Sequence, residues 1–129
     1  MAVGIKDSSG DPDMLEERCE AFPYKEVFAG TDGVTLTCLR AGGSGIMSGA
    51  NNIIPDIVTE IYANYETDIG AAAQDRLGQI RTAMGALPWF SALKATKAWL
   101  SGDPSWCNAR PAIRRLTTEE EKTLRANLA

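Results

Sequence analysis

The sequence predicts an α/β fold in which a parallel sheet comes first and a helical region follows. Three short apolar segments, at residues 2–6, 25–29 and 44–49, are typical of buried strands, and segments with helical spacing of apolar residues separate them. Connections of this kind between parallel strands are right-handed, so we expect the three strands to lie parallel in one sheet. After residue 50 every periodic segment has the spacing of a helix.

The helices of the first half carry local start and stop signals. Residues 11–22 predict a helix because Asp11 can cap its first turn and Pro12 fits its first position. A shorter helix is expected after the second strand, with Asp32 as its cap and Gly42-Gly43 as its end. Both segments have apolar residues on one side, which predicts that both helices pack on the sheet.

The second half predicts four helices. The first spans residues 51–65 and has a continuous apolar stripe of isoleucine, valine and tyrosine. The next two begin at Asp68 and at Pro88. The last follows a loop, and its start is indicated by Thr117 and Glu120, which have the spacing of a capping box.

The composition excludes several classes of function. With 13 basic and 17 acidic side chains in 129 residues, the net charge is −4, and no basic face for nucleic acid is expected. The absence of histidine excludes histidine-based triads and histidine metal sites. The odd number of widely spaced cysteines (Cys19, Cys38 and Cys107) favours free thiols in a cytoplasmic protein. We expect no metal and no cofactor. We also expect no membrane span, because no apolar stretch approaches the ~20 residues needed to cross a bilayer.

One lysine occupies a position where parallel α/β enzymes hold reactive groups. Lys6 ends the first apolar segment, and a polar turn separates it from the helix that starts at Asp11. If the segment is a buried strand, Lys6 lies at its carboxyl end, where barrels and open α/β sheets place their working residues. A lysine enclosed by apolar walls can lose its proton near neutral pH and attack a carbonyl to form a Schiff base. The alternative is that Lys6 only ends a strand in solvent.

Three parallel strands do not complete an α/β architecture. A barrel requires about eight strands, and an open sheet of three would expose apolar edges that favour association. We therefore expect the chain to be the final part of a larger α/β domain.

Several motifs make the chain similar to a known family. The sequence resembles the dihydrodipicolinate synthase / N-acetylneuraminate lyase family, Schiff-base-forming (β/α)8-barrel lyases, at residues 4–11 (GIKDSSGD), 29–32 (AGTD), 41–48 (AGGSGIMS) and 50–51 (AN). The resemblance implies a partial TIM barrel. Residues 1–66 would form its last three parallel βα units, from the sixth strand, and residues 67–129 a C-terminal helical extension packed on the barrel.

The resemblance also implies roles for individual residues. Lys6 would form an imine with the keto carbon of pyruvate or a related 2-oxo acid, and the protonated imine would serve as an electron sink. Gly30 would leave room beside that lysine, and Met47 would offer its backbone carbonyl to the bound acid. Ser48 and Asn51 would line the same end of the barrel. The alternatives are that Met47 is a core residue and that Gly30 only satisfies a backbone turn.

The family's other working parts have no counterpart in the sequence. A threonine loop for the substrate carboxylate and a tyrosine proton relay belong to the first five βα units, and Asp7 is more simply a turn former than a proton carrier. We therefore expect a pyruvate-type lyase or aldolase that is inactive alone and needs a complementing N-terminal half or a homo-oligomer. The alternative is a non-catalytic truncated scaffold that associates through its exposed sheet edge.

Overall fold

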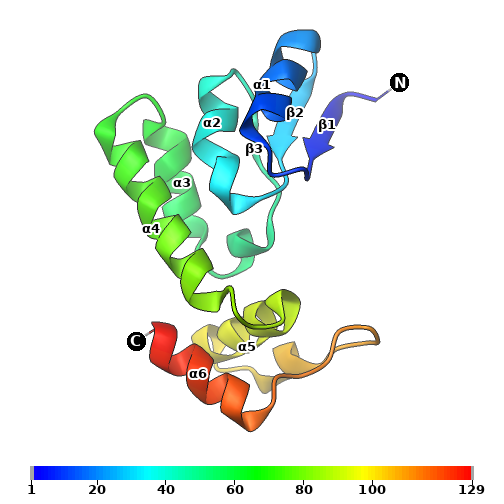
Figure 1. Ribbon diagram of the computed structural model, residues 1–129, viewed down its shortest axis with the longest axis vertical. Coiled ribbons are helices and arrows are strands. Elements are labelled where there is room, and N and C mark those ends of the chain that lie inside the picture. The colour runs from blue at the N-terminus through cyan, green and yellow to red at the C-terminus, as the bar shows by residue number, and fades with distance from the viewer. Residues whose placement is uncertain (1, 129) are drawn as a thin grey trace. The chain divides into compact units, whose positions relative to one another are not determined.

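The computed structural model describes residues 2–128 and has an α/β architecture (Figure 1). Its sheet is parallel with the strand order β1-β2-β3. The strands are β1 (Gly4–Asp7), β2 (Glu26–Ala29) and β3 (Gly45–Ile46). The α-helices are α1 (Pro12–Ala21), α2 (Thr35–Arg40), α3 (Pro55–Asn64), α4 (Asp68–Met84), α5 (Trp89–Ser101) and α6 (Thr118–Leu128), joined in places by the short 3-10 turns η1 (Asp32–Val34), η2 (Gly49–Asn52) and η3 (Pro104–Cys107). The predicted α/β class and parallel sheet are confirmed.

The chain forms two compact units. The first is Met1–Gly78 and contains the sheet, and the second is Gln79–Ala129 and is helical. The boundary falls inside α4, whereas the predicted division after residue 66 falls between α3 and α4. That a sheet-bearing part precedes a helical part is common to both descriptions.

The strand register assigns the side chains of the sheet to two faces. Val27 and Ala29 are only 2% and 0% exposed and belong to the core that α1 and α2 form. Asp7 pairs with Ala29, and paired residues of parallel strands point to the same face, so Asp7 lies on this helix-covered face. Lys6 pairs with Phe28 and therefore lies on the opposite face. We call this second side the Lys6 face.

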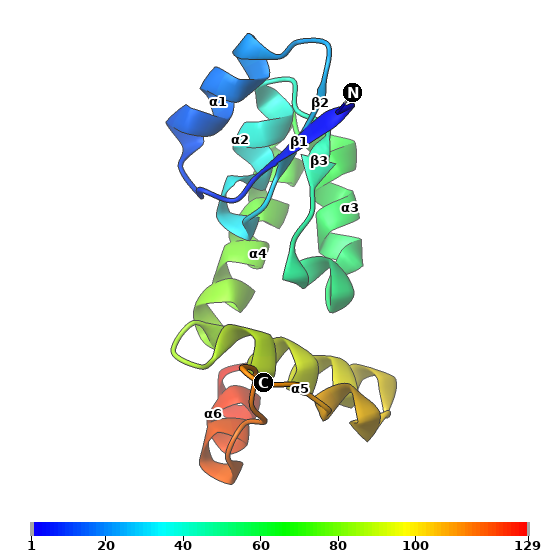
Figure 2. The ribbon, with the colours of Figure 1, turned by 90° about the vertical axis from the view of Figure 1, so that its right-hand side faces the viewer.

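The core of the sheet region consists of small and medium-sized apolar side chains. Figure 2 shows α1 and α2 on the same side of the strands. The buried side chains between these helices and the sheet are those of Leu15, Cys19, Val27, Ala29, Val34 and Cys38. Leu15 and Cys19 lie one helical turn apart on α1, as the predicted amphipathic pattern requires.

The start of α1 is confirmed as predicted. The Asp11 side chain accepts hydrogen bonds from the Asp13 N–H (3.0 Å) and the Met14 N–H (3.4 Å), and Pro12 is the first helical residue. These bonds satisfy two of the backbone donors that have no partner within the helix.

Asp32 does not cap the following helix, so that prediction is wrong. The chain enters α2 through η1, and neither N-cap residue, Thr31 or Val34, makes a side-chain cap bond. The Asp32 backbone carbonyl accepts a hydrogen bond from Thr35 Oγ1 (3.0 Å). Its carboxylate instead accepts a hydrogen bond from the Ser48 hydroxyl. The inserted 3-10 turn therefore moves this side chain away from the helix end.

The third strand is shorter than predicted. Only Gly45–Ile46 is paired with β2 as a strand, and one backbone bond flanks it on each side, from the Ser44 N–H to the Val27 carbonyl (2.7 Å) and from the Met47 N–H to the Ala29 carbonyl (2.8 Å). The Asn51 side-chain amide donates to the Ile46 carbonyl (3.2 Å), and the Ser48 hydroxyl accepts from the Ala50 N–H (3.2 Å) at the start of η2. After Met47 these side-chain bonds lead the chain out of the strand and into η2.

The helix predicted over residues 51–65 begins later, at Pro55. A residue before proline is disfavoured in the helical conformation, and Ile54 has φ −136° and ψ 53°. The apolar stripe is confirmed except at Tyr62, which is 58% exposed: Ile61 is buried, and partly buried side chains pack against its cluster at Ile54, Ile57, Val58 and Tyr65. A second buried cluster of this unit contains Leu39, Ala50, Ile61, Ala73 and Leu77.

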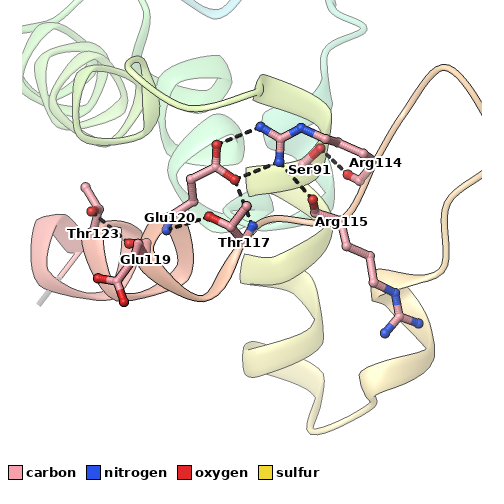
Figure 3. A network of polar contacts seen from close by, with 7 residues as sticks. All are labelled: Ser91, Arg114, Arg115, Thr117, Glu119, Glu120 and Thr123. Carbon is pink, nitrogen blue, oxygen red and sulfur yellow. Dashed lines mark hydrogen bonds and ion pairs between the residues drawn. The ribbon is translucent and has the colours of Figure 1, made fainter.

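The helical unit has predictable boundaries. α5 ends at Gly102, whose φ of 68° lies in the left-handed region that favours glycine. In α6 the predicted capping box is confirmed, because the Thr117 N–H donates to Glu120 Oε2 (2.8 Å) and the Glu120 N–H donates to Thr117 Oγ1 (3.3 Å). Figure 3 shows that Arg114 also reaches Glu120, with both guanidinium bonds at 2.7 Å. The Arg114 carbonyl accepts the hydroxyl of Ser91 on α5 (2.5 Å), which ties the loop before α6 to α5.

Replacing Glu120 with glutamine is expected to remove a pH-dependent contribution to stability. Hydrogen bonds from Arg114, followed by the Thr117 N–H, lower the pKa of Glu120 to about 2. A carboxylate with a lowered pKa in the folded state stabilises above its unfolded pKa, and this contribution disappears as pH falls toward 2. Melting curves of wild type and E120Q from pH 7 to pH 2 should differ above pH 5 and converge in acid. The control E121Q should run parallel to wild type, and a constant gap between E120Q and wild type would contradict the prediction.

Candidate functional site

Three neighbouring strands end at one level, and the predicted site residues lie at these ends. The pairs Asp7 with Ala29 and Ala29 with Ile46 set this level. Lys6 is the next-to-last residue of β1, Gly30 follows β2, and Met47 and Ser48 follow β3. The structure therefore brings together the segments that carry the four predicted site residues, at the carboxyl end of the sheet.

Lys6 is exposed and its strand is firmly paired. Its side chain lies on the Lys6 face together with that of Phe28, which is half-buried. The apolar walls that an unprotonated amine requires are not formed around Lys6 by the described residues. The position of the lysine at the end of a parallel strand agrees with the prediction, whereas its enclosure does not follow from this chain alone.

The residue after the lysine is a buried carboxylate with two partners. Asp7 is 5% exposed, its Oδ1 accepts the Ser9 N–H (2.7 Å), and its Oδ2 forms an ion pair with Arg18 Nε of α1. Within the described chain these two paired atoms have no other hydrogen-bond partner. Hydrogen bonding from Ser9 is the main cause that holds the pKa of Asp7 below its usual value, against the opposing effect of burial, and Arg18 acts in the same direction. Asp7 forms the predicted turn and also anchors α1.

Gly30 is required by a close approach of two backbones. Its N–H donates to the Asp7 carbonyl at 2.5 Å. A Cβ at Gly30 would lie 2.6 Å from that carbonyl oxygen and 2.9 Å from the Ser8 Cα. Both are backbone atoms, so the chain itself would have to move. The predicted room for substrate beside Lys6 stays a prediction, while the turn-forming alternative has a concrete cause.

Met47 and Ser48 have different surroundings. The Met47 N–H donates to the Ala29 carbonyl (2.8 Å), and its side chain is 48% exposed, so it is not a core side chain in this structure. Ser48 is half-buried, and its hydroxyl donates to the Asp32 carboxylate and lies 3.4 Å from Asn51 Oδ1. The Asn51 side chain thus bonds back to the end of β3, and the Ser48 hydroxyl joins the loop after β3 to the turn after β2.

Sequence reasoning missed two members of this cluster. Asp32 is 4% exposed, and Gln74 of α4 donates to its backbone carbonyl (3.0 Å) while accepting the Leu36 N–H (3.0 Å). The number of residues between Asp32 and Ser48 did not predict their hydrogen bond, because only the folded chain brings them together. The one available signal was that Asp32 and Ser48 follow two strands expected to be adjacent in the sheet, β2 and β3.

The possible metal ligands of residues 2–128 are not arranged like those of a metal site. No group of three or more histidine, cysteine, aspartate or glutamate side chains in this range is arranged to hold a metal ion. All three cysteines are free thiols, and burial is the main cause that raises the pKa of Cys19 and Cys38. In the same range no helix is both long and apolar enough to cross a membrane.

The close approach at Gly30 predicts a large effect for a very small substitution. Gly30→Ala would push its methyl group into the Asp7 carbonyl and Ser8, and overpacking of this kind costs about 1–3 kcal/mol. Urea unfolding followed by circular dichroism measures the loss. Gly33→Ala is the matched control, because a Cβ there meets no atom within 4 Å. Equal unfolding free energies for the two variants would contradict the backbone constraint.

Comparison with known proteins identifies the family and the fold that this chain shares. The family described as the dihydrodipicolinate synthetase family matches residues 1–129. An uncharacterized DapA-like lyase of Chloroflexus aurantiacus is 30% identical over 124 residues, which are 95% of this chain and 41% of that protein. The crystal structure of the dihydrodipicolinate synthase DapA-2 from Bacillus anthracis is 26% identical, with a TM-score of 0.85 over 98% of this chain and 44% of that one.

A third similarity concerns the fold alone. YagE from E. coli K12, a protein of the dihydrodipicolinic acid synthase family solved in complex with pyruvate, is 22% identical, with a TM-score of 0.84. The structural match covers 98% of this chain and 45% of the YagE chain. The chain thus spans less than half the length of the relatives and structures described here. The match over its whole length shows that it belongs to the dihydrodipicolinate synthetase family.

Proposed function

We propose that this chain carries the imine-forming part of a lyase or aldolase that acts on pyruvate or a related 2-oxo acid. The observation that carries the proposal is the position of Lys6 at the carboxyl end of a parallel strand, on the face opposite α1 and α2. Parallel α/β enzymes hold their reacting groups at this end of the sheet. The solved relative YagE, which is bound to pyruvate, supports the choice of substrate class.

The chemistry follows from an amine held at this position. The unprotonated Nζ of Lys6 attacks the keto carbon, and loss of water from the adduct leaves a protonated imine. In the cleavage direction the hydroxyl on the β carbon loses its proton to a base, the bond between the α and β carbons breaks, and its electron pair passes to the imine, which gives an aldehyde and an enamine. Protonation of the enamine carbon restores the imine, and hydrolysis releases the 2-oxo acid and the free lysine; synthesis runs through the same steps in reverse. The backbone carbonyl of Met47 would contact the bound acid, and Gly30 and Ser48 would line its binding site from the ends of β2 and β3.

The exposure of Lys6 makes this activity depend on further structure. Imine formation requires an amine shielded from water, and Lys6 is exposed in this chain. We propose that the remaining strands of a (β/α)8 barrel, with β1, β2 and β3 as its last three, cover the Lys6 face and supply the acid–base and carboxylate-binding groups. A cytoplasmic setting belongs to the same proposal, since Cys19, Cys38 and Cys107 are free thiols.

A second candidate function is a non-catalytic scaffold that associates through its sheet. β1 and β3 are the outer strands of the sheet formed by the described residues, and outer strands present unpaired backbone groups. A pocket of about 250 Å³ lies beside β3, lined by residues that include Leu39, Ile46, Val58 and Tyr62. Tyr62 is 58% exposed, so this side of β3 offers apolar surface to a partner.

Trapping with pyruvate and borohydride tests the catalytic proposal. Reduction of an imine leaves the pyruvate carbons attached to Lys6, and peptide mass spectrometry locates the added mass. We expect little adduct on the chain alone and more after mixing with the part of DapA-2 that precedes its matched segment. Lys6→Arg should abolish the adduct, and Lys25→Arg should leave it unchanged. No adduct at Lys6 under either condition would refute the proposal.

Size-exclusion chromatography with light scattering tests the scaffold function. Association through the outer strands predicts a mass above that of one chain, rising with protein concentration. Replacing Ile46 in β3 with proline removes a backbone donor and should shift the distribution toward single chains. Circular dichroism should first establish that the variant is folded. A folded wild type that stays monomeric at all concentrations argues against this function.

A further inference from the structure

Asp7 holds three separate elements in place at the residue next to Lys6. Its Oδ1 accepts the Ser9 N–H and so closes the turn after β1. Its Oδ2 pairs with Arg18 of α1, and its backbone carbonyl accepts the Gly30 N–H at the end of β2.

Successive side chains of a strand point to opposite faces, so the anchoring side chain of Asp7 and the side chain of Lys6 lie on different faces of the sheet. Asp7 points to the face covered by α1 and α2, where it is 5% exposed, and Lys6 points to the opposite face, where it is exposed. A carboxylate that reached the lysine directly would form an ion pair with it. Here the carboxylate pairs with Arg18 instead, and the lysine side chain stays on the other face.

The strength of the anchor comes from burial. The Asp7 side chain is 3% exposed, while that of Arg18 is 34% exposed and reaches the pair from the helix. Removing one partner of a buried ion pair leaves the other charge uncompensated, which is more costly than losing an exposed pair. The buried ion pair between Asp7 and Arg18 therefore holds the end of β1 in one position.

We infer that Asp7 is a positioning residue for Lys6, which fixes the last peptide of β1 through Ser9, Arg18 and Gly30 and so sets the direction of the reactive amine. The inference rests on the proposed role of Lys6. It assigns Asp7 no contact with the substrate. A displaced end of β1 would shift the amine relative to any acid bound near Met47, and small shifts of a reacting group lower rates strongly.

The test combines a chemical probe of Lys6 with the trapping reaction. Wild type, Asp7→Asn and the control Asp13→Asn, which removes an exposed carboxylate from the first turn of α1, are labelled with limiting acetic anhydride. Mass spectrometry then gives the ratio of labelled Lys6 to labelled Lys122. All measurements are made at a temperature where circular dichroism shows the variants to be folded, so a loss of stability by itself does not change the ratio.

Asp7→Asn should change this ratio by at least about threefold and, in the mixture with the N-terminal part of DapA-2, slow pyruvate trapping about ten- to hundredfold. Asp13→Asn should match wild type in both. Arg18→Gln should act in the direction of Asp7→Asn, and Arg18→Lys, which keeps the charge, should restore part of the effect. If Asp7→Asn does not fold, the pair Arg18→Gln and Arg18→Lys decides the question by the same ratio.

The outcomes separate the two proposals. A folded Asp7→Asn variant, or Arg18→Gln in its place, with the wild-type labelling ratio would overturn the positioning role, even if its melting temperature falls. A changed ratio in a protein whose wild type forms no pyruvate adduct would refute the proposed function and leave the placement of Lys6 by Asp7 supported. A changed ratio together with slower trapping supports both.

Discussion

The ends of β1 and β2 approach each other so closely that the residue facing the Asp7 carbonyl has to be a glycine. This contact, between the Gly30 N–H and the Asp7 carbonyl, fixes the level at which both strands end. β3 joins at the same level through Ile46, the partner of Ala29. Lys6, Gly30 and Met47 are brought to one edge of the sheet by this backbone constraint rather than by contacts of their own side chains.

The buried carboxylate at the end of β1 is tolerated because it has partners close by in the sequence. Asp7 lies on the helix-covered face beside Ala29, which is fully buried, and an unpaired carboxylate there would be costly. The Ser9 N–H and Arg18 satisfy the carboxylate, and both partners come from the turn and helix that directly follow β1. The segment from Lys6 to Arg18 thus folds back on itself, and the pattern GIKDSSGD combines one exposed lysine with a locally satisfied anchor.

Local signals allowed much of the fold to be predicted, and contacts between distant residues account for the differences. The ends of α1, α5 and α6 follow from Asp11, Gly102 and the Thr117 capping box, which act within one turn of the chain. The length of β3 was overestimated because the chain turns into η2 after Met47, where Ser48 caps the 3-10 turn, and strand propensity does not contain that turn.

In the candidate site, too, features set by local sequence could be predicted, and contacts between distant residues could not. The position of Lys6 in a parallel strand could be predicted from the short apolar run before it and the polar turn after it. The hydrogen bond between Ser48 and Asp32, and the reach of Gln74 across to the Asp32 carbonyl, could not, because each joins segments that only the folded chain brings together.

The exposure of Lys6 separates two requirements that an imine-forming lysine has to meet. Such a residue needs a fixed direction, which a paired strand and the Asp7 anchor provide from the helix-covered face. It also needs a desolvated amine, which only atoms on the Lys6 face can provide. These requirements lie on opposite faces of one strand, so the first can be complete while the second is absent. On the proposed function, the groups that cover the Lys6 face therefore control reactivity without having to place the lysine.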